Sequence, residues 1–132
     1  MSGSRGTILV VEDNSSNLEL ATDLLTAAGY TVRQAHSGEE GVRLAQAELP
    51  ALILMDLRLP GMDGYAAFRA LKADSRTAHI PTIALTAQAM KGDEERVRAA
   101  GFNGYISKPI DTRTFSLAVG RVLGSARGGS TP

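Results

Sequence analysis

The stretch Leu52-Ile-Leu-Met-Asp56 decides the fold class, because four consecutive apolar residues run directly into a carboxylate. A second run, Ile8-Leu-Val-Val11, has the same form and is followed by Glu12 and Asp13. Near-continuous apolar runs of this length are typical of strands that are buried on both faces, as in a parallel sheet. The two runs therefore predict buried parallel strands whose carboxyl ends carry acids.

Segments with helical periodicity separate these runs from one another. Three further strands are predicted, at Thr31–Ala35, Thr82–Thr86 and Gly104–Ser107. Apolar stripes of helical spacing fall within 18–28, 42–45, 67–71, 97–102 and 115–123. Gly29 is expected to end the first helix, and Ser37 with Glu40 forms a capping box for the second. Alternating strands and helices predict a doubly wound, flavodoxin-like α/β fold, and five strands favour the order 2-1-3-4-5.

Composition limits the classes of protein to be considered. The chain has 132 residues, of which 43% are hydrophobic and 21% charged, so it is expected to form one globular domain. It has no cysteine, which excludes disulfides, Cys-ligated zinc and a cysteine nucleophile. Lysine and arginine total 14, as do aspartate and glutamate, so the basic footprint of a nucleic-acid-binding domain is missing.

The chain ends and the apolar runs suggest a simple organisation. Residues 1–6 and 124–132 are rich in Gly and Ser, so we expect flexible ends around a folded domain at 7–123. No apolar run approaches the ~20 residues that span a bilayer. The first six residues also lack the apolar core of a signal peptide. These features predict a cytoplasmic protein that does not contact membranes.

Chemically active side chains follow four of the predicted strands. They are Glu12 with Asp13, Asp56, Thr86 and Lys108. Each taken alone is ordinary for a loop or a strand end, but the carboxyl ends of parallel strands meet at one edge, where ligands bind. Three carboxylates crowded there need a counter-charge, and Mg²⁺ prefers such oxygen ligands. A carboxylate nucleophile, Mg²⁺, a lysine and a hydroxyl are the parts of a site that forms an aspartyl phosphate.

These motifs together resemble the receiver domain of two-component response regulators. The resemblance rests on Val10-Val-Glu-Asp-Asn14, Leu54-Met-Asp-Leu-Arg-Leu-Pro-Gly-Met-Asp-Gly64, Ala84-Leu-Thr-Ala87 and Tyr105-Ile-Ser-Lys-Pro109, and it covers about Thr7–Leu123. It implies that Asp56 is the phosphoacceptor and that Lys108 contacts the phosphoryl group. It also implies that Asp13 binds Mg²⁺ directly, Glu12 through water, and Arg58 through its backbone carbonyl.

The same resemblance implies a switch and a set of partners. Thr86 would be the switch hydroxyl, Tyr105 the switch aromatic, Ala87 the small residue beside the phosphoryl group, and the Lys108–Pro109 peptide would be cis. A sensor histidine kinase or a histidine phosphotransfer protein would donate the phosphoryl group. A downstream protein would bind the face formed by the fourth helix, fifth strand and fifth helix. Residues 89–96 further resemble single-domain polarity regulators of this family, and also receivers fused to hybrid kinases.

We therefore predict a signalling domain that assists only its own phosphorylation and dephosphorylation, rather than an enzyme with a separate substrate. Two alternatives remain open from the sequence. The chain could be a receiver excised from a hybrid kinase or a larger regulator. It could also be a haloacid-dehalogenase-like phosphatase, although such enzymes place Asp-x-Asp after the first strand, whereas Asp56-Leu-Arg58 follows the third.

Overall fold

The structure is a computed structural model that describes residues 5–86 and 93–128, with side chains up to Gly124. Its centre is a five-stranded parallel sheet in the order β2-β1-β3-β4-β5, which confirms the predicted order. The strands are β1 (Thr7–Val11), β2 (Thr31–Ala35), β3 (Leu52–Asp56), β4 (Thr82–Thr86) and β5 (Gly104–Ser107). Each agrees with its predicted run to within one residue at either end.

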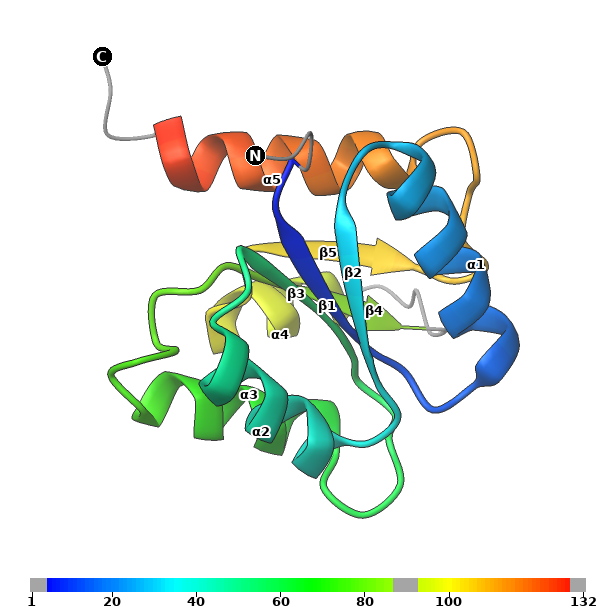
Figure 1. Cartoon of the computed structure of the whole chain (residues 1–132). Helices are drawn as coiled ribbons and strands as arrows, with labels where there is room; N and C mark the ends of the chain where they lie inside the picture. The colour runs from blue at the N-terminus through cyan, green and yellow to red at the C-terminus, as the bar shows by residue number, and fades with distance from the viewer. Residues whose placement is uncertain (1–4, 87–92, 129–132) are drawn as a thin grey trace.

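Helices cover both faces of the sheet (Figure 1). One face carries α1 (Ser15–Ala27) and α5 (Phe115–Gly128), and the other carries α2 (Gly38–Glu48), α3 (Gly64–Ala73) and α4 (Asp93–Ala100). The central strands are therefore buried on both sides, as their continuous apolar runs predicted. In the part of the chain that the structure describes, no helix is long and apolar enough to cross a membrane.

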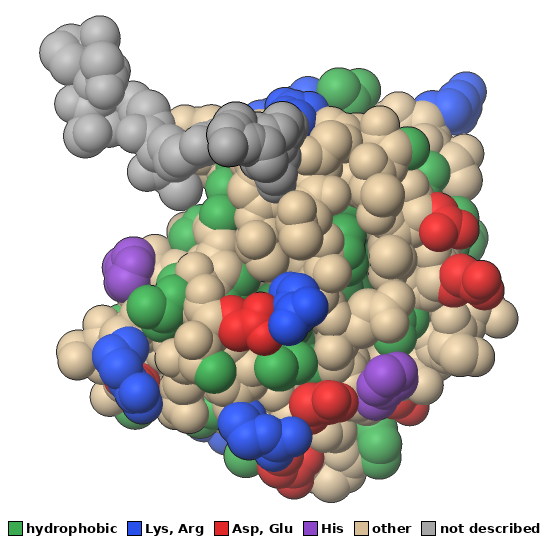
Figure 2. All heavy atoms as spheres, in the orientation of Figure 1, with side chains coloured by type: hydrophobic (Ala, Val, Ile, Leu, Met, Phe, Trp, Pro, Cys, Tyr) green, Lys and Arg blue, Asp and Glu red, His purple; other side chains and the backbone are tan. Residues whose placement is uncertain are grey.

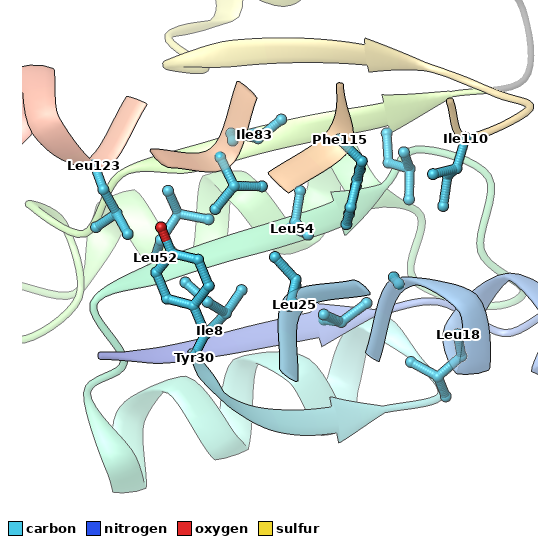
Figure 3. Close-up of a cluster of buried hydrophobic side chains, with 14 residues drawn as sticks. Ile8, Leu18, Leu25, Tyr30, Leu52, Leu54, Ile83, Ile110, Phe115 and Leu123 are labelled. Atoms are coloured by element: carbon cyan, nitrogen blue, oxygen red, sulfur yellow. The ribbon is translucent and has the colours of Figure 1, made fainter. Parts of the chain in front are cut away.

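The sheet divides the interior into two hydrophobic cores. Successive residues of β1 point to opposite faces, so Ile8 and Val10 join one core while Leu9 and Val11 join the other. In the first core, Phe115 from α5 and Leu25 from α1 point toward the strands (Figure 3). The two cores hold the central strands from both sides, and their carboxyl ends are thereby fixed relative to one another.

Local signals set the helix ends. Asn14 caps α1 by accepting a hydrogen bond from the Asn17 amide at 2.9 Å, and Gly29 follows the helix with a φ of 102°. Ser37 caps α2 as predicted, accepting from the Glu40 amide at 3.1 Å. The return bond of the capping box differs from the expectation, because the Glu40 carboxylate accepts from the His36 amide, one residue before the cap.

Two other boundaries differ from the predictions. Helix α4 ends at Ala100, so Phe102 is not part of the fourth helix. Its ring instead stacks on Phe68 with 3.9 Å between ring centroids, which explains why an apolar residue recurs there. Helix α5 continues to Gly128, past the expected end of the folded region at Leu123.

The chain is also anchored earlier than Thr7. The Arg5 amide donates to the Gly29 carbonyl at 2.9 Å, and its guanidinium donates to the Ala28 carbonyl at 3.1 Å. The same guanidinium lies 4.8 Å from the centre of the Tyr30 ring. Arg5 therefore ties the start of the chain to the end of α1.

Strand β2 forms one edge of the sheet, and its central side chain is charged. Arg33 makes two hydrogen bonds of 2.7 Å to the Glu48 carboxylate at the end of α2. The face of the molecule that carries β2 shows basic and acidic side chains scattered among separate hydrophobic ones (Figure 2). This edge therefore presents charge rather than a continuous apolar strip.

Candidate functional site

The predicted acidic residues do meet at one edge of the sheet. Carboxylate oxygens of Glu12, Asp13 and Asp56 all lie within 4.8 Å of one another. Glu12 and Asp13 follow β1, and Asp56 is the last residue of the neighbouring strand β3. Glu12 and Asp56 are buried, whereas Asp13 is exposed. The cluster thus combines two enclosed carboxylates with one that faces solvent.

Each buried carboxylate is oriented by a backbone amide two residues further along the chain. Glu12 Oε2 accepts from the Asn14 amide at 3.1 Å, and Asp56 Oδ1 accepts from the Arg58 amide at 3.0 Å. The remaining oxygen of each group faces a common cation. Lys108 Nζ lies 2.9 Å from Glu12 Oε1 and 3.2 Å from Asp56 Oδ2. Two short loops therefore aim two carboxylates at one ammonium group.

The position of Lys108 follows from the end of β5. Its amide donates to the Thr86 carbonyl at 2.7 Å, which continues the pairing of β4 with β5 by one residue. The following Lys108–Pro109 peptide is cis, as predicted. The Lys108 side chain is only 13% exposed, and burial opposes its charge, but the adjacent carboxylates outweigh burial and raise its pKa. Lys108 is therefore a fixed positive charge.

One ammonium group does not neutralise the whole cluster. Burial and the neighbouring Asp56 carboxylate together raise the pKa of Glu12 to about 7, although the contact with Lys108 acts to lower it. Among the described side chains, Glu12 Oε1 is the buried polar atom that lacks a well-directed hydrogen bond, although it lies close to Lys108. A site with surplus negative charge and a poorly satisfied oxygen suits a hard divalent cation.

Glycine at position 64 allows the loop after β3 to close tightly. A Cβ atom at Gly64 would collide with the Asp56 carbonyl oxygen and would lie 2.7 Å from Leu57 Cα. The Gly64 amide also donates to the Leu57 carbonyl at 3.2 Å. Asp63, just before it, caps α3 by accepting from the Ala66 amide at 2.8 Å. The loop that follows Asp56 is therefore folded back against Asp56 itself.

Thr86 and Tyr105 lie on the neighbouring strands β4 and β5, beside this cluster. Thr86 is buried and lines a hollow of about 310 Å³ that Arg58 and Arg96 also line. Tyr105 is half-buried, and burial together with Asp93 and Glu94 raises its pKa. Tyr105 therefore lies near the first turn of α4.

A few features of the site were either predicted at residues that the structure does not describe or were not predicted at all. Ala87 and the first part of the 89–96 stretch lie outside the residues that the structure describes. The sequence did not indicate why Gly38 is needed, but a Cβ there would lie 2.6 Å from the Met62 carbonyl oxygen. Nor did it indicate the orienting roles of the Asn14 and Arg58 amides, because backbone donors leave no trace in residue type.

Comparison with known families settles the class of the protein. The profile of the response regulator receiver domain matches residues 8–119. The chain belongs to the response regulator receiver family. Receivers are signalling domains of two-component systems that bind Mg²⁺ at an acidic site and interact with histidine kinases or phosphotransfer proteins. The chain is therefore not a haloacid-dehalogenase-like phosphatase, the alternative left open by the sequence.

Individual receivers are similar over almost their whole length. The polar-differentiation response regulator DivK of Brucella ovis is 46% identical over 119 residues, which cover 90% of this chain and 97% of DivK. The receiver domain of the sensor histidine kinase PA1611 from Pseudomonas aeruginosa is 39% identical with a TM-score of 0.83, covering 91% and 98%. That structure has a magnesium ion coordinated in its active site cleft. The chemotaxis response regulator CheY4 of Vibrio cholerae is 28% identical with a TM-score of 0.82, covering 88% and 97%.

Proposed function

We propose that this receiver accepts a phosphoryl group on Asp56 and thereby switches its interactions with other proteins. The observation that carries the proposal is the placement of Asp56. It is enclosed at the end of β3, oriented by the Arg58 amide and 3.2 Å from the Lys108 ammonium. A carboxylate that is held rigidly beside a fixed cation is prepared to attack an electrophilic phosphorus.

In this proposal, Asp13, Asp56 and the backbone carbonyl of Arg58 hold Mg²⁺, with Glu12 in reach through water. The fit is supported by the acidic cluster, in which three carboxylates share a single ammonium group. When bound, the ion supplies positive charge that offsets the carboxylates and the phosphoryl oxygens. Lys108, which follows β5, supplies a second positive charge that is present whether or not the metal is bound.

The phosphoryl donor is a phosphohistidine on a sensor histidine kinase or a histidine phosphotransfer protein. An oxygen of Asp56 forms a bond to phosphorus as the bond from phosphorus to the imidazole nitrogen breaks. The electron pair of the broken bond stays on that nitrogen, which takes up a proton. The charge of the transferred group is then met by Lys108 and by the Thr86 hydroxyl at the end of the adjacent strand.

The output follows from the position of Thr86 and Tyr105. When Thr86 moves to donate to a phosphoryl oxygen, it vacates space next to α4. Tyr105 carries an apolar ring and a polar tip, so it can occupy either an inner or an outer position. A packed interior favours two discrete arrangements over a graded one. The face formed by α4, β5 and α5 would thus report the state of Asp56 to a downstream protein.

The proposal is tested by phosphorylation of Asp56→Asn with acetyl phosphate. The amide keeps the size of the side chain but lacks the nucleophilic oxygen, so incorporation of label is expected to be abolished. Asp23→Asn is the matched control, because Asp23 is an exposed acid on α1 that does not belong to the cluster. Full labelling of Asp56→Asn, or label that survives acid and base, would contradict the assignment.

A further inference from the structure

A groove with arginines on two of its sides lies between α4 and α5. It has a volume of about 500 Å³ and runs along β5 at the edge of the sheet opposite β2. Its lining comprises Arg98, Asn103, Gly104, Tyr105, Ala118, Arg121 and Val122. All of its charged lining residues are basic. From this groove we infer that the downstream partner docks through an acidic segment, an inference that rests on the proposed function.

The side chains of Asn103 and of the two arginines offer hydrogen-bond donors to the groove. Asn103 Oδ1 accepts from the Thr82 amide at 3.0 Å, which leaves the amide nitrogen of the Asn103 side chain to donate. Arginine guanidinium groups have donors only, and they match the geometry of a carboxylate. The groove is therefore complementary to the side chains of aspartate and glutamate.

The two arginines differ in how readily they can bind a ligand. Arg98 pairs with Glu94 at 3.1 Å, and both side chains are 57% exposed. An exposed pair four residues apart on one helix is weak, so an incoming carboxylate can replace Glu94. Arg121 makes no ion pair with any side chain that the structure describes. Arg121 is thus ready to bind, and Arg98 becomes available by exchange.

Small and apolar groups form the rest of the groove lining. Gly104 lies at its base, where a Cβ would be only 3.0 Å from the Val122 side chain. Ala118 and the Tyr105 ring line the same space, and Leu117 on α5 nearby is 64% exposed. These surfaces suit apolar side chains that flank a carboxylate. Because Tyr105 also forms part of the lining, the proposed switch would change the groove directly.

A protein segment fits this surface better than a nucleic acid. The first turn of α4 carries Asp93, Glu94 and Glu95, so acidic side chains precede Arg98 on the helix that borders the groove. An extended phosphate backbone would meet these acids, whereas a short peptide can place one or two carboxylates between the arginines. The balanced net charge of +0 agrees with a local rather than a general attraction for anions.

The test is an NMR titration of the full chain with the peptide acetyl-Glu-Leu-Glu-Glu-Leu-Glu-amide, against the same peptide with Gln in place of Glu. We expect the acidic peptide alone to shift the amides of Gly104, Tyr105, Ala118 and Val122. The double variant Arg98→Ala/Arg121→Ala should bind at least about tenfold more weakly. Arg69→Ala, which removes an exposed arginine from α3, is the control and should bind normally.

A second pair of variants tests the exchange of Glu94. Glu94→Gln releases Arg98 and is expected to strengthen binding several-fold, whereas Glu95→Gln removes the same charge from the same turn and should have a smaller effect. Equal effects of the two would contradict the exchange. Three results would overturn the inference. The first is equal binding of the Gln peptide, and the second is tighter binding of a ten-nucleotide oligothymidylate. The third is a set of concentration-dependent shifts without peptide, which would indicate a second copy in the groove.

Repeating the titration with beryllofluoride, which mimics the phosphoryl group, separates the two proposals. An affinity for the acidic peptide that changes with beryllofluoride supports both. Peptide binding in the groove that beryllofluoride does not alter supports the acidic partner and counts against the switch. A normal response of the α4–β5–α5 face to beryllofluoride without peptide binding refutes the acidic partner alone.

Discussion

Replacing Gly64 with alanine tests how tightly the loop after β3 holds Asp56. The new Cβ atom would collide with the Asp56 carbonyl oxygen and would lie 2.7 Å from Leu57 Cα. Both neighbours are backbone atoms, so no flexible side chain can move aside. The loop and the start of α3 must shift instead, and they carry Asp56 with them.

The expected loss of stability follows from two opposing contributions. Overpacking in a tight site typically costs ~1–3 kcal/mol. Alanine is favoured over glycine in a helix interior by ~0.5–1 kcal/mol, and Gly64 is only the first residue of α3, so little of this gain applies. We therefore expect Gly64→Ala to lower the free energy of unfolding by ~1–2 kcal/mol, consistent with overpacking.

Gly124→Ala is the matched control. Nothing lies within 4 Å of a Cβ at this position, which is inside α5, so the substitution should raise the free energy of unfolding by up to ~1 kcal/mol. Urea unfolding followed by circular dichroism measures both variants. With a urea slope of ~2 kcal/mol per molar, the middle of the usual range, the Gly64→Ala midpoint should fall by roughly 0.5–1 M.

The phosphorylation rate of Gly64→Ala with acetyl phosphate should fall as well, because Asp56 no longer has its native orientation. The reasoning is refuted if the midpoint of Gly64→Ala equals that of the unmodified protein. It is also refuted if Gly124→Ala loses as much stability, since the effect would then belong to glycine replacement in general.

Three further predictions concern charge and coupling at the site. Glu12 has a pKa raised from 4.5 to about 7, so the folded protein holds an extra proton between these values. The stability of the metal-free protein should therefore fall as pH rises through this range, and Mg²⁺ affinity measured by NMR should fall as pH drops below about 7; Glu12→Gln should flatten both profiles. Lys108→Ala should retain Mg²⁺ binding yet slow phosphotransfer, and normal labelling together with normal partner binding would exclude a role for Lys108. Thr86→Ala should accept label on Asp56 while the beryllofluoride-induced shifts of the Tyr105 amide shrink; shifts that match the unmodified protein would show that the coupling takes another route.

The fold could be predicted because its signals are local and repeat along the chain. Continuous apolar runs are typical of strands buried on both sides, and Leu52–Met55 are fully buried in the sheet. Strand ends then place Glu12, Asp56 and Lys108 together without any knowledge of side-chain geometry. What the apolar pattern cannot specify is where a helix stops, since α4 ends before Phe102, which continues its pattern, and α5 extends past Leu123, where its pattern ends.

The finer structure of the site depends on groups that residue type does not reveal. The amides of Asn14 and Arg58 orient the buried carboxylates, but every residue except proline has such a donor. The basic groove joins Arg98 to Arg121, which are distant in sequence and belong to separate helices. Only the three-dimensional packing of α4, β5 and α5 brings them to one surface.

The charged edge of β2 has a consequence for how this protein behaves in a crowded solution. An edge strand offers unpaired backbone groups to any other extended chain, and a flat apolar edge is a template for aggregation. Here an incoming strand would have to lie beside Arg33, whose guanidinium already makes two hydrogen bonds to the Glu48 carboxylate. Pairing would strip water from these ions without a compensating partner. The Arg33–Glu48 pair should thus keep molecules apart at concentrations where repeated encounters between copies are unavoidable, even though it adds little to the stability of each one.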